Sequence, residues 1–106
     1  MNIHSTLADA PVYSEFTNDA DFEDLLQFFA KIVKQKITVF NELSESGNRE
    51  LLRGEAHKLK GSAGGYGFPE LSLLAATLEA NCSKESTLDV KPACANVIDY
   101  MQRIRI

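Results

Sequence analysis

His57 is the residue of this sequence best placed to carry chemistry. On a helix, four neighbouring apolar side chains share one narrow stripe, formed by Leu52, Ala56, Leu59 and Ala63. His57 lies well off that stripe, and Gly61 and Gly64 follow it one and two turns later. A glycine inside a helix costs about 1 kcal/mol relative to alanine. We infer that the bare backbone beside an exposed imidazole lets another protein bring a reactive group up to it.

The residues around His57 indicate the kind of reaction. A neutral imidazole is nucleophilic near neutral pH. No Ser or Cys is placed to act as a nucleophile activated by His57, and no acidic cluster indicates a metal. Lys60 follows one turn later and Lys58 lies nearby. Because cations favour an incoming anion, and phosphoryl groups are the commonest anions handled this way, we predict that His57 accepts and passes on a phosphoryl group.

The motif around His57 resembles that of the histidine-containing phosphotransfer (HPt) domain. The residues that carry the resemblance are His57-Lys58-Leu59-Lys60-Gly61-Ser62-Ala63, Gly67-Phe68, Leu71 and Leu78-Glu79. The resemblance covers residues 15–106, so we expect an HPt-like bundle there, preceded by an N-terminal arm at residues 1–14. HPt domains work in multistep phosphorelays and as the N-terminal domain of chemotaxis histidine kinases.

The resemblance implies a role for each matching residue. His57 would be the phosphoacceptor, Lys60 the cation near the phosphoryl group, and Gly61 the residue that leaves space for docking. Glu79 stands where the family often has a Gln or Glu hydrogen-bonded to the other ring nitrogen of the histidine. Ala76 departs from the chemotaxis-kinase pattern, which usually has a second histidine at this position, so the phosphorelay role is favoured.

The resemblance also implies the partners. A response-regulator receiver domain would exchange the phosphoryl group between its aspartate and His57, and a sensor or hybrid histidine kinase would stand upstream. The Mg²⁺ for this reaction belongs to the receiver, so we expect neither a cofactor nor a metal on this chain. The protein would then be a phosphoryl carrier, with catalysis supplied by its partner.

Some of these residues also have a purely structural interpretation. Gly61 could pack against a neighbouring helix, and Gly64 could serve the helix end instead of docking. Glu79 could be an ordinary surface charge. Phe68 and the apolar residues near it are candidates for the receiver-docking surface.

Two other functions remain open at this point. The chain could be the phosphoacceptor domain of a larger chemotaxis-type or hybrid kinase, or an interaction bundle that never carries phosphate. Met1 at the start and Arg105-Ile106 at the end favour a free-standing protein. An exposed nucleophile argues against a module that only binds.

Composition agrees with one small globular domain. The chain has 106 residues, of which 44% are hydrophobic and 25% charged, enough for a single core. Its net charge of −4 gives no reason to expect nucleic acid or an anionic membrane as partner. There is no signal peptide and no apolar run of the ~20 residues that span a bilayer, so we expect a cytoplasmic protein.

The two cysteines, Cys82 and Cys94, form no CxxC pair and are expected to be buried thiols in a reducing compartment. A zinc site made of His4, His57 and these cysteines would lack the usual ligand spacing and would cover the nucleophile. We therefore discount it.

The pattern of apolar residues predicts helices throughout, joined by short connections. A long helix capped by Thr17 or Asn18 should end near residue 45, and Ser46-Gly47-Asn48 should separate it from the next. The other three are expected at about 49–65, 69–82 and 90–104. This predicts an all-α fold, an antiparallel up-down-up-down four-helix bundle with a short N-terminal extension.

The inward face of each helix follows from the same spacing. The long helix contributes Phe22, Leu25, Phe29, Ile32, Val33 and Phe40, with Lys36 as the one polar interruption. The third contributes Leu71, Leu74, Ala75 and Leu78, and the fourth Ala93, Val97, Tyr100, Met101 and Ile104.

Overall fold

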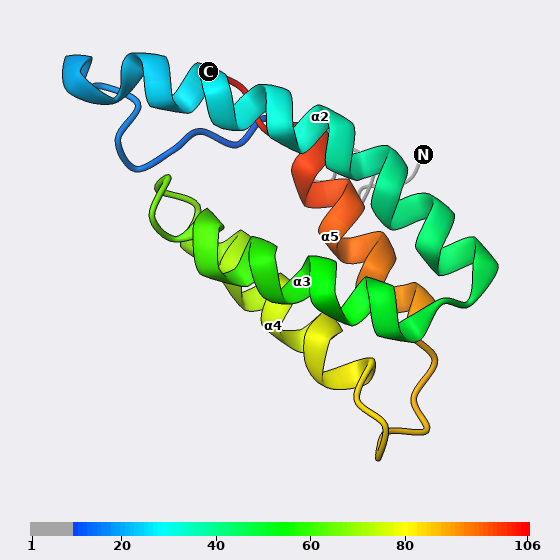
Figure 1. Ribbon diagram of the computed structural model, residues 1–106. Coiled ribbons are helices and arrows are strands. Elements are labelled where there is room, and N and C mark those ends of the chain that lie inside the picture. Colours follow the sequence, from blue (N-terminus) through cyan, green and yellow to red (C-terminus); the bar gives the residue numbers. More distant parts are fainter. Residues whose placement is uncertain (1–9) are drawn as a thin grey trace.

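Four α-helices dominate the computed structural model, which describes residues 10–106 (Figure 1). A short 3-10 helix, η1 (Ala20–Phe22), is followed by α2 (Glu23–Ser46), α3 (Arg49–Ala63), α4 (Pro69–Asn81) and α5 (Lys91–Arg103). The described residues form no strand beyond one isolated bridge between Val12 and Ile104. The predicted all-α class is confirmed.

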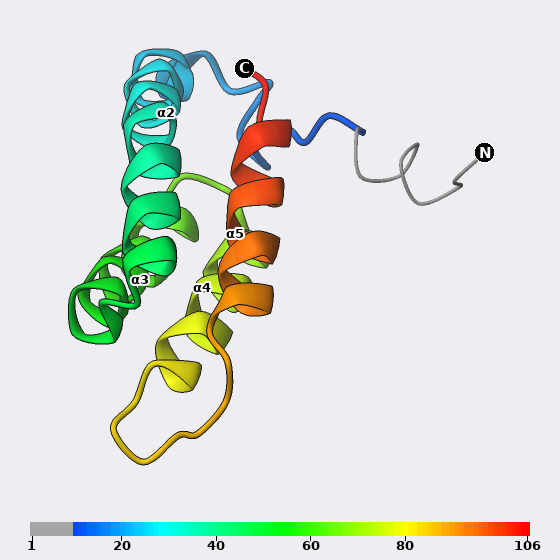
Figure 2. The same ribbon diagram turned by 90° about the vertical axis from the view of Figure 1, so that its right-hand side faces the viewer.

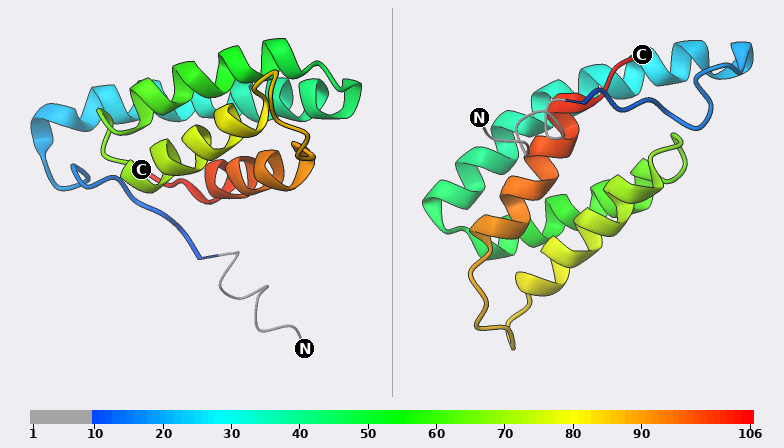
Figure 3. Two further views of the ribbon diagram at one scale, coloured as in Figure 1. Left: turned by 90° about the horizontal axis from the view of Figure 1, so that it is seen from below. Right: turned by 180° about the vertical axis from the view of Figure 1, so that it is seen from behind.

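The helices pack as a ring of neighbours. α3 contacts α2 and α4, and α5 contacts the same two helices from the other side. In Figure 1 the chain turns back at each of the three connections between α-helices. The 64–68 and 82–90 connections lie at opposite ends of α4 (Figure 3).

Local residues explain most helix boundaries. Gly47 has a φ of 71° and ends α2, while the side chain of Asn48 accepts a hydrogen bond from the N–H of Leu51 and caps α3. Pro69 lies in the first turn of α4, where its missing N–H does no harm. The start of α2 differs from the prediction, because neither Thr17 nor Asn18 caps it. Asp19 caps η1 by accepting a hydrogen bond from the N–H of Asp21, and α2 then begins at Glu23 without a side-chain cap.

The core contains most of the predicted inward residues, including Phe29, Phe40, Leu52, Leu71, Leu78 and Val97. The prediction that Leu25 points inward is wrong, since its side chain is 47% exposed on α2.

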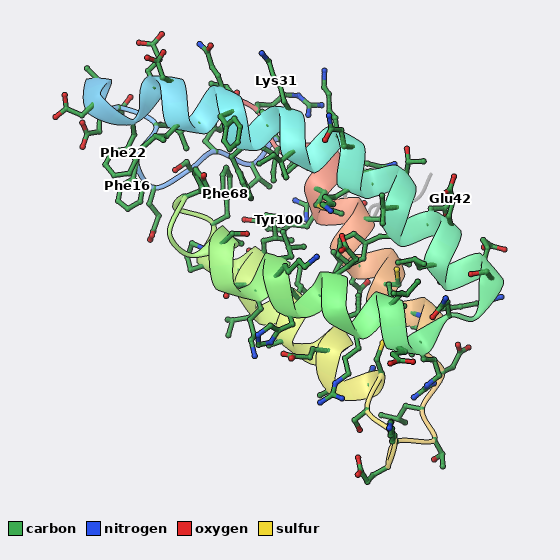
Figure 4. The ribbon with its side chains drawn as sticks, in the orientation of Figure 1. Phe16, Phe22, Lys31, Glu42, Phe68 and Tyr100 are labelled. Atoms are coloured by element: carbon green, nitrogen blue, oxygen red, sulfur yellow. The ribbon has the colours of Figure 1, made fainter. Side chains whose placement is uncertain are left out.

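The prediction for Phe68 is also wrong. Its side chain is fully buried and points between the helices, as Figure 4 shows, so it cannot form a receiver-docking surface.

Phe68 belongs to an aromatic cluster that joins α2 to the 64–68 connection. The Phe29 ring stacks on Tyr66 with 4.4 Å between centroids, and on Phe68 with 5.6 Å. Such pairs contribute about 0.5–1.5 kcal/mol each beyond the area they bury. The cluster therefore fixes the end of α3 against α2.

Cys82 and Cys94 are buried free thiols, as predicted. Burial raises the pKa of both, since it disfavours the thiolate.

The segment before η1 is irregular but lies against the bundle. Residues 1–9 of the expected arm lie outside the described residues. The N–H of Val12 donates to the carbonyl of Arg103 at 2.8 Å, and that of Arg105 donates to Val12 at 2.8 Å. Figure 2 shows this segment (blue) beside the C-terminal end of the chain (red). Residues 10–14 are thus held to the domain rather than free of it.

Gly67 contacts the same N-terminal segment. Its φ of 87° is one that glycine adopts without strain, and a Cβ there would lie only 2.9 Å from the nitrogen of Glu15. The N–H of Glu15 donates to the carbonyl of Gly67 at 2.9 Å. The last glycine of the sequence motif therefore has a structural role, which is to let the N-terminal segment approach.

Arg49 holds the 82–90 connection against α3. Its guanidinium donates to four backbone carbonyls, those of Asn81, Ser83, Ser86 and Leu88. Three of these bonds come from one nitrogen, so they are shared rather than additive. Sequence reasoning did not foresee this contact, because no local pattern links residues so far apart.

We predict opposite effects for alanine at two glycines of the motif. Gly67→Ala should destabilise the fold by about 1–3 kcal/mol, because it combines a strained φ with a backbone clash. Gly61→Ala should stabilise it by about 0.5–1 kcal/mol, since α3 is regular there and a Cβ would meet nothing within 4 Å. Urea unfolding of both variants measures this. A loss of stability in Gly61→Ala would show that this glycine serves packing.

Candidate functional site

His57 projects from the middle of α3. The stripe of Leu52, Ala56, Leu59 and Ala63 is buried as predicted, which turns the opposite side of α3 outward. The His57 side chain is 66% exposed. A residue in the middle of a packed helix has a fixed backbone, so the imidazole is presented to solvent in a defined position.

Glu79 on α4 connects His57 to Lys60. One carboxylate oxygen, Oε2, lies 2.7 Å from Nδ1 of His57, and the other, Oε1, lies 2.6 Å from Nζ of Lys60. The Glu79 side chain is only 18% exposed. The structure thus brings together three predicted site residues, and Glu79 is more than an isolated surface charge.

The register of α4 against α3 makes this bridge possible. Ser72 lies two turns before Glu79, and its hydroxyl donates to the carbonyl of Lys60 at 2.7 Å. Leu71, Ala75 and Leu78, on the inner side of α4, are fully buried. A shift of α4 by one turn, about 5.4 Å, would move the Glu79 carboxylate out of reach of the imidazole.

The bridge selects one tautomer of His57. An ionised carboxylate can only accept hydrogen bonds, so Nδ1 must carry the hydrogen. In the neutral ring, Nε2 then has a free lone pair. Nε2 makes no hydrogen bond with the residues that the structure describes, and it is the nitrogen available for attack.

The ionised state of Glu79 is favoured by its surroundings. The hydrogen bond from Lys60 lowers the pKa of the Glu79 carboxyl, and the bond from His57 adds to this, although desolvation opposes both. Glu79 is therefore charged at neutral pH. The stabilisation that the charged Glu79 gives the site is fully present above the usual pKa of a carboxyl group. It is lost only as the pH falls through the lowered pKa of Glu79.

Lys58 takes no part in the bridge. It is 75% exposed, with Nζ 3.4 Å from Oε2 of Glu55, whose Oε1 lies 2.6 Å from Nζ of Lys36. Burial raises the pKa of Glu55, but the hydrogen bonds and charges of Lys36 and Lys58 lower it by more. The pKa of Glu55 therefore lies below its usual value. The ion pair between Lys36 and Glu55 also explains the polar interruption in the apolar face of α2, because Lys36 connects α2 to α3 there.

Two glycines of α3, Gly54 and Gly61, and Gly64 at its C-cap leave bare backbone on both sides of His57. Gly61 and Gly64 are exposed, and a Cβ at either would meet nothing within 4 Å, so neither packs against a neighbouring helix. Gly54 has the same property and was missed by sequence reasoning. The signal was present in the spacing, because residues 54, 57, 61 and 64 follow the helical 3-4-3 pattern. We call Gly54, Gly61 and Gly64 the glycine face.

Two further properties bear on the class of site. Among residues 10–106 no three His, Cys, Asp or Glu side chains lie close enough together to hold a metal ion, and His4 lies outside these residues. None of the helices in this part of the chain has the length and apolar character needed to cross a bilayer.

The tautomer of His57 can be tested directly. Removing the carboxylate in Glu79→Ala should shift the neutral ring toward the form with hydrogen on Nε2, because nothing then favours hydrogen on Nδ1. The ¹⁵N shifts of the two ring nitrogens report this, and Glu79→Gln should behave like the wild type because its amide oxygen still accepts. Ring shifts that are identical in all three proteins would contradict the bridge.

Comparison with known proteins gives one match. The model of the Hpt domain family matches residues 20–105 of this chain. No curated protein and no solved structure matches it. Hpt domains act in phosphotransfer within two-component signalling, as carriers that interact with receiver domains and kinases. Because the match covers all four α-helices and the His57 site, the chain belongs to the Hpt domain family.

Proposed function

We propose that this protein carries a phosphoryl group on Nε2 of His57, to or from the aspartate of response-regulator receiver domains in a phosphorelay. One observation carries the proposal: Glu79 holds Nδ1 and leaves Nε2 as an unbonded nucleophile on an exposed ring. A sensor or hybrid histidine kinase would stand upstream. We place this activity in the cytoplasm, on an up-down-up-down antiparallel bundle.

The transfer needs no proton movement on this chain. The lone pair of Nε2 attacks the phosphorus of the receiver's aspartyl phosphate, and the bond between phosphorus and the aspartate oxygen breaks. The aspartate leaves with that electron pair, and the new nitrogen–phosphorus bond forms. The ring becomes cationic while Nδ1 keeps its hydrogen. The Glu79 carboxylate, 2.7 Å away, stabilises this positive charge.

The reverse reaction uses the same atoms, so the protein can donate as well as accept. The receiver supplies Mg²⁺ and most of the catalysis. What this chain contributes is a positioned nucleophile and a fixed counter-charge. Such a carrier has no need of ATP or of a cofactor of its own.

The glycine face would provide the room for docking. A receiver must bring its aspartate to within bonding distance of Nε2, and side chains beside His57 would obstruct that approach. Since Gly54, Gly61 and Gly64 are all exposed and meet nothing, we infer that they leave the backbone bare for this purpose. With a net charge of −4, the chain offers no strong positive field to attract an acidic receiver, so contact rather than long-range steering would supply the affinity.

Transfer from a phosphorylated receiver tests the proposal. In the presence of Mg²⁺ the protein should gain one phosphoryl group that is labile in acid and stable in alkali, as a phosphoramidate is. His57→Gln should gain none while its far-UV circular dichroism stays helical, because the side chain is exposed. Labelling of the Gln variant would show that another residue is the acceptor. A wild type that takes no phosphoryl group from any receiver of its host would favour the interaction bundle.

A further inference from the structure

A shallow cleft opens beside His57 on the side of the α3 N-terminus. It is lined by His57 itself and by Glu50, Arg53, Gly54 and Glu79. Helical side chains lean toward the N-terminus of their helix, so the imidazole lies over the turn that contains residues 53 and 54. Gly54 leaves this turn without a side chain. A group attached to the ring can therefore be accommodated in the cleft.

The lysine expected to meet that group uses one of its three N–H donors on Glu79. Nζ of Lys60 lies 2.6 Å from Glu79, and Lys60 follows His57 in the chain rather than preceding it. Lys58 is paired with Glu55. Neither lysine lines the cleft. A phosphoryl group in the cleft would therefore gain from a further cation that lines it.

Arg53 is the cation that lines the cleft. It precedes His57 by four residues, which places the two side chains on neighbouring positions of one helix face. Its side chain is exposed and forms no hydrogen bond or ion pair with the residues that the structure describes. It also lines a second cavity, with Cys82 and Lys84, so it has open space on two sides. The guanidinium is thus free to move.

We propose that Arg53 binds the phosphoryl group carried by His57. This proposal rests on the proposed function, because it concerns the phosphorylated state of the same site. A guanidinium presents paired N–H donors that match two phosphoryl oxygens. Arg53 would act beside Lys60, which also bonds the Glu79 carboxylate that holds Nδ1.

Glu50 should act in the opposite sense. Its carboxylate lines the same cleft and lies one turn before Arg53, with no oxygen within ion-pair distance of the guanidinium. A negative charge there repels a phosphoryl dianion and competes for Arg53. Removing the charge of Glu50 and removing the charge of Arg53 should therefore shift the pKa of the phosphoryl group in opposite directions.

The experiment uses phosphoramidate as the donor, so that no receiver docking enters the measurement. The purified full chain is phosphorylated, and the pH midpoint of the phosphohistidine ³¹P resonance is measured. Because a nearby cation favours the dianion, Arg53→Gln should raise the midpoint by about 0.3–1 pH unit, and Glu50→Gln should lower it. Arg53→Lys should restore part of the wild-type value.

Lys84→Gln is the matched control. It removes one positive charge from the neighbouring cavity but not from the cleft of His57. Equal shifts in Arg53→Gln and Lys84→Gln, or no shift in either, would overturn the role of Arg53. Failure of the wild type to form phosphohistidine at all would instead count against the proposed function, which keeps the two conclusions separate.

Discussion

The carboxylate of Glu79 is the group on which the rest of the site depends. It accepts from Nδ1 of His57 and from Nζ of Lys60 at once, across the interface between α3 and α4. This single contact selects the tautomer, leaves Nε2 free, and supplies the counter-charge for a cationic ring. It exists only because the buried faces of the two helices set their register. Packing in the core thus determines the position of the groups that react at the surface.

The glycines show how the fold balances stability against access. Gly67 is required by the backbone, since its φ is positive and the N-terminal segment lies against it. The glycine face has no such requirement, because a Cβ at Gly54, Gly61 or Gly64 would meet nothing. Gly54 and Gly61, which lie inside α3, each give up about 0.5–1 kcal/mol of helix stability relative to alanine. Bare backbone around an oriented nucleophile is the property gained in return.

Much of the fold could be predicted from the sequence, because helix ends and apolar stripes are local signals. The spacing around His57 likewise indicated Lys60 and Gly61. Contacts between distant residues could not be read this way. The core position of Phe68 depends on stacking with Phe29 of α2, and the pairing of Lys60 depends on the register of α4. Helical spacing places Gly54 and Arg53 beside His57, but the cleft that they line also depends on Glu79 of α4, which no local pattern could show.

The identity of the phosphorylated nitrogen tests the central claim most directly. If Glu79 holds Nδ1, the phosphoryl group can be attached only to Nε2. Two-dimensional ¹⁵N–³¹P correlation on protein labelled with ¹⁵N in the histidine rings distinguishes the two isomers. The account predicts a single species with phosphorus on Nε2 of His57. Phosphorus on Nδ1 would contradict it, since that nitrogen could not then donate to Glu79.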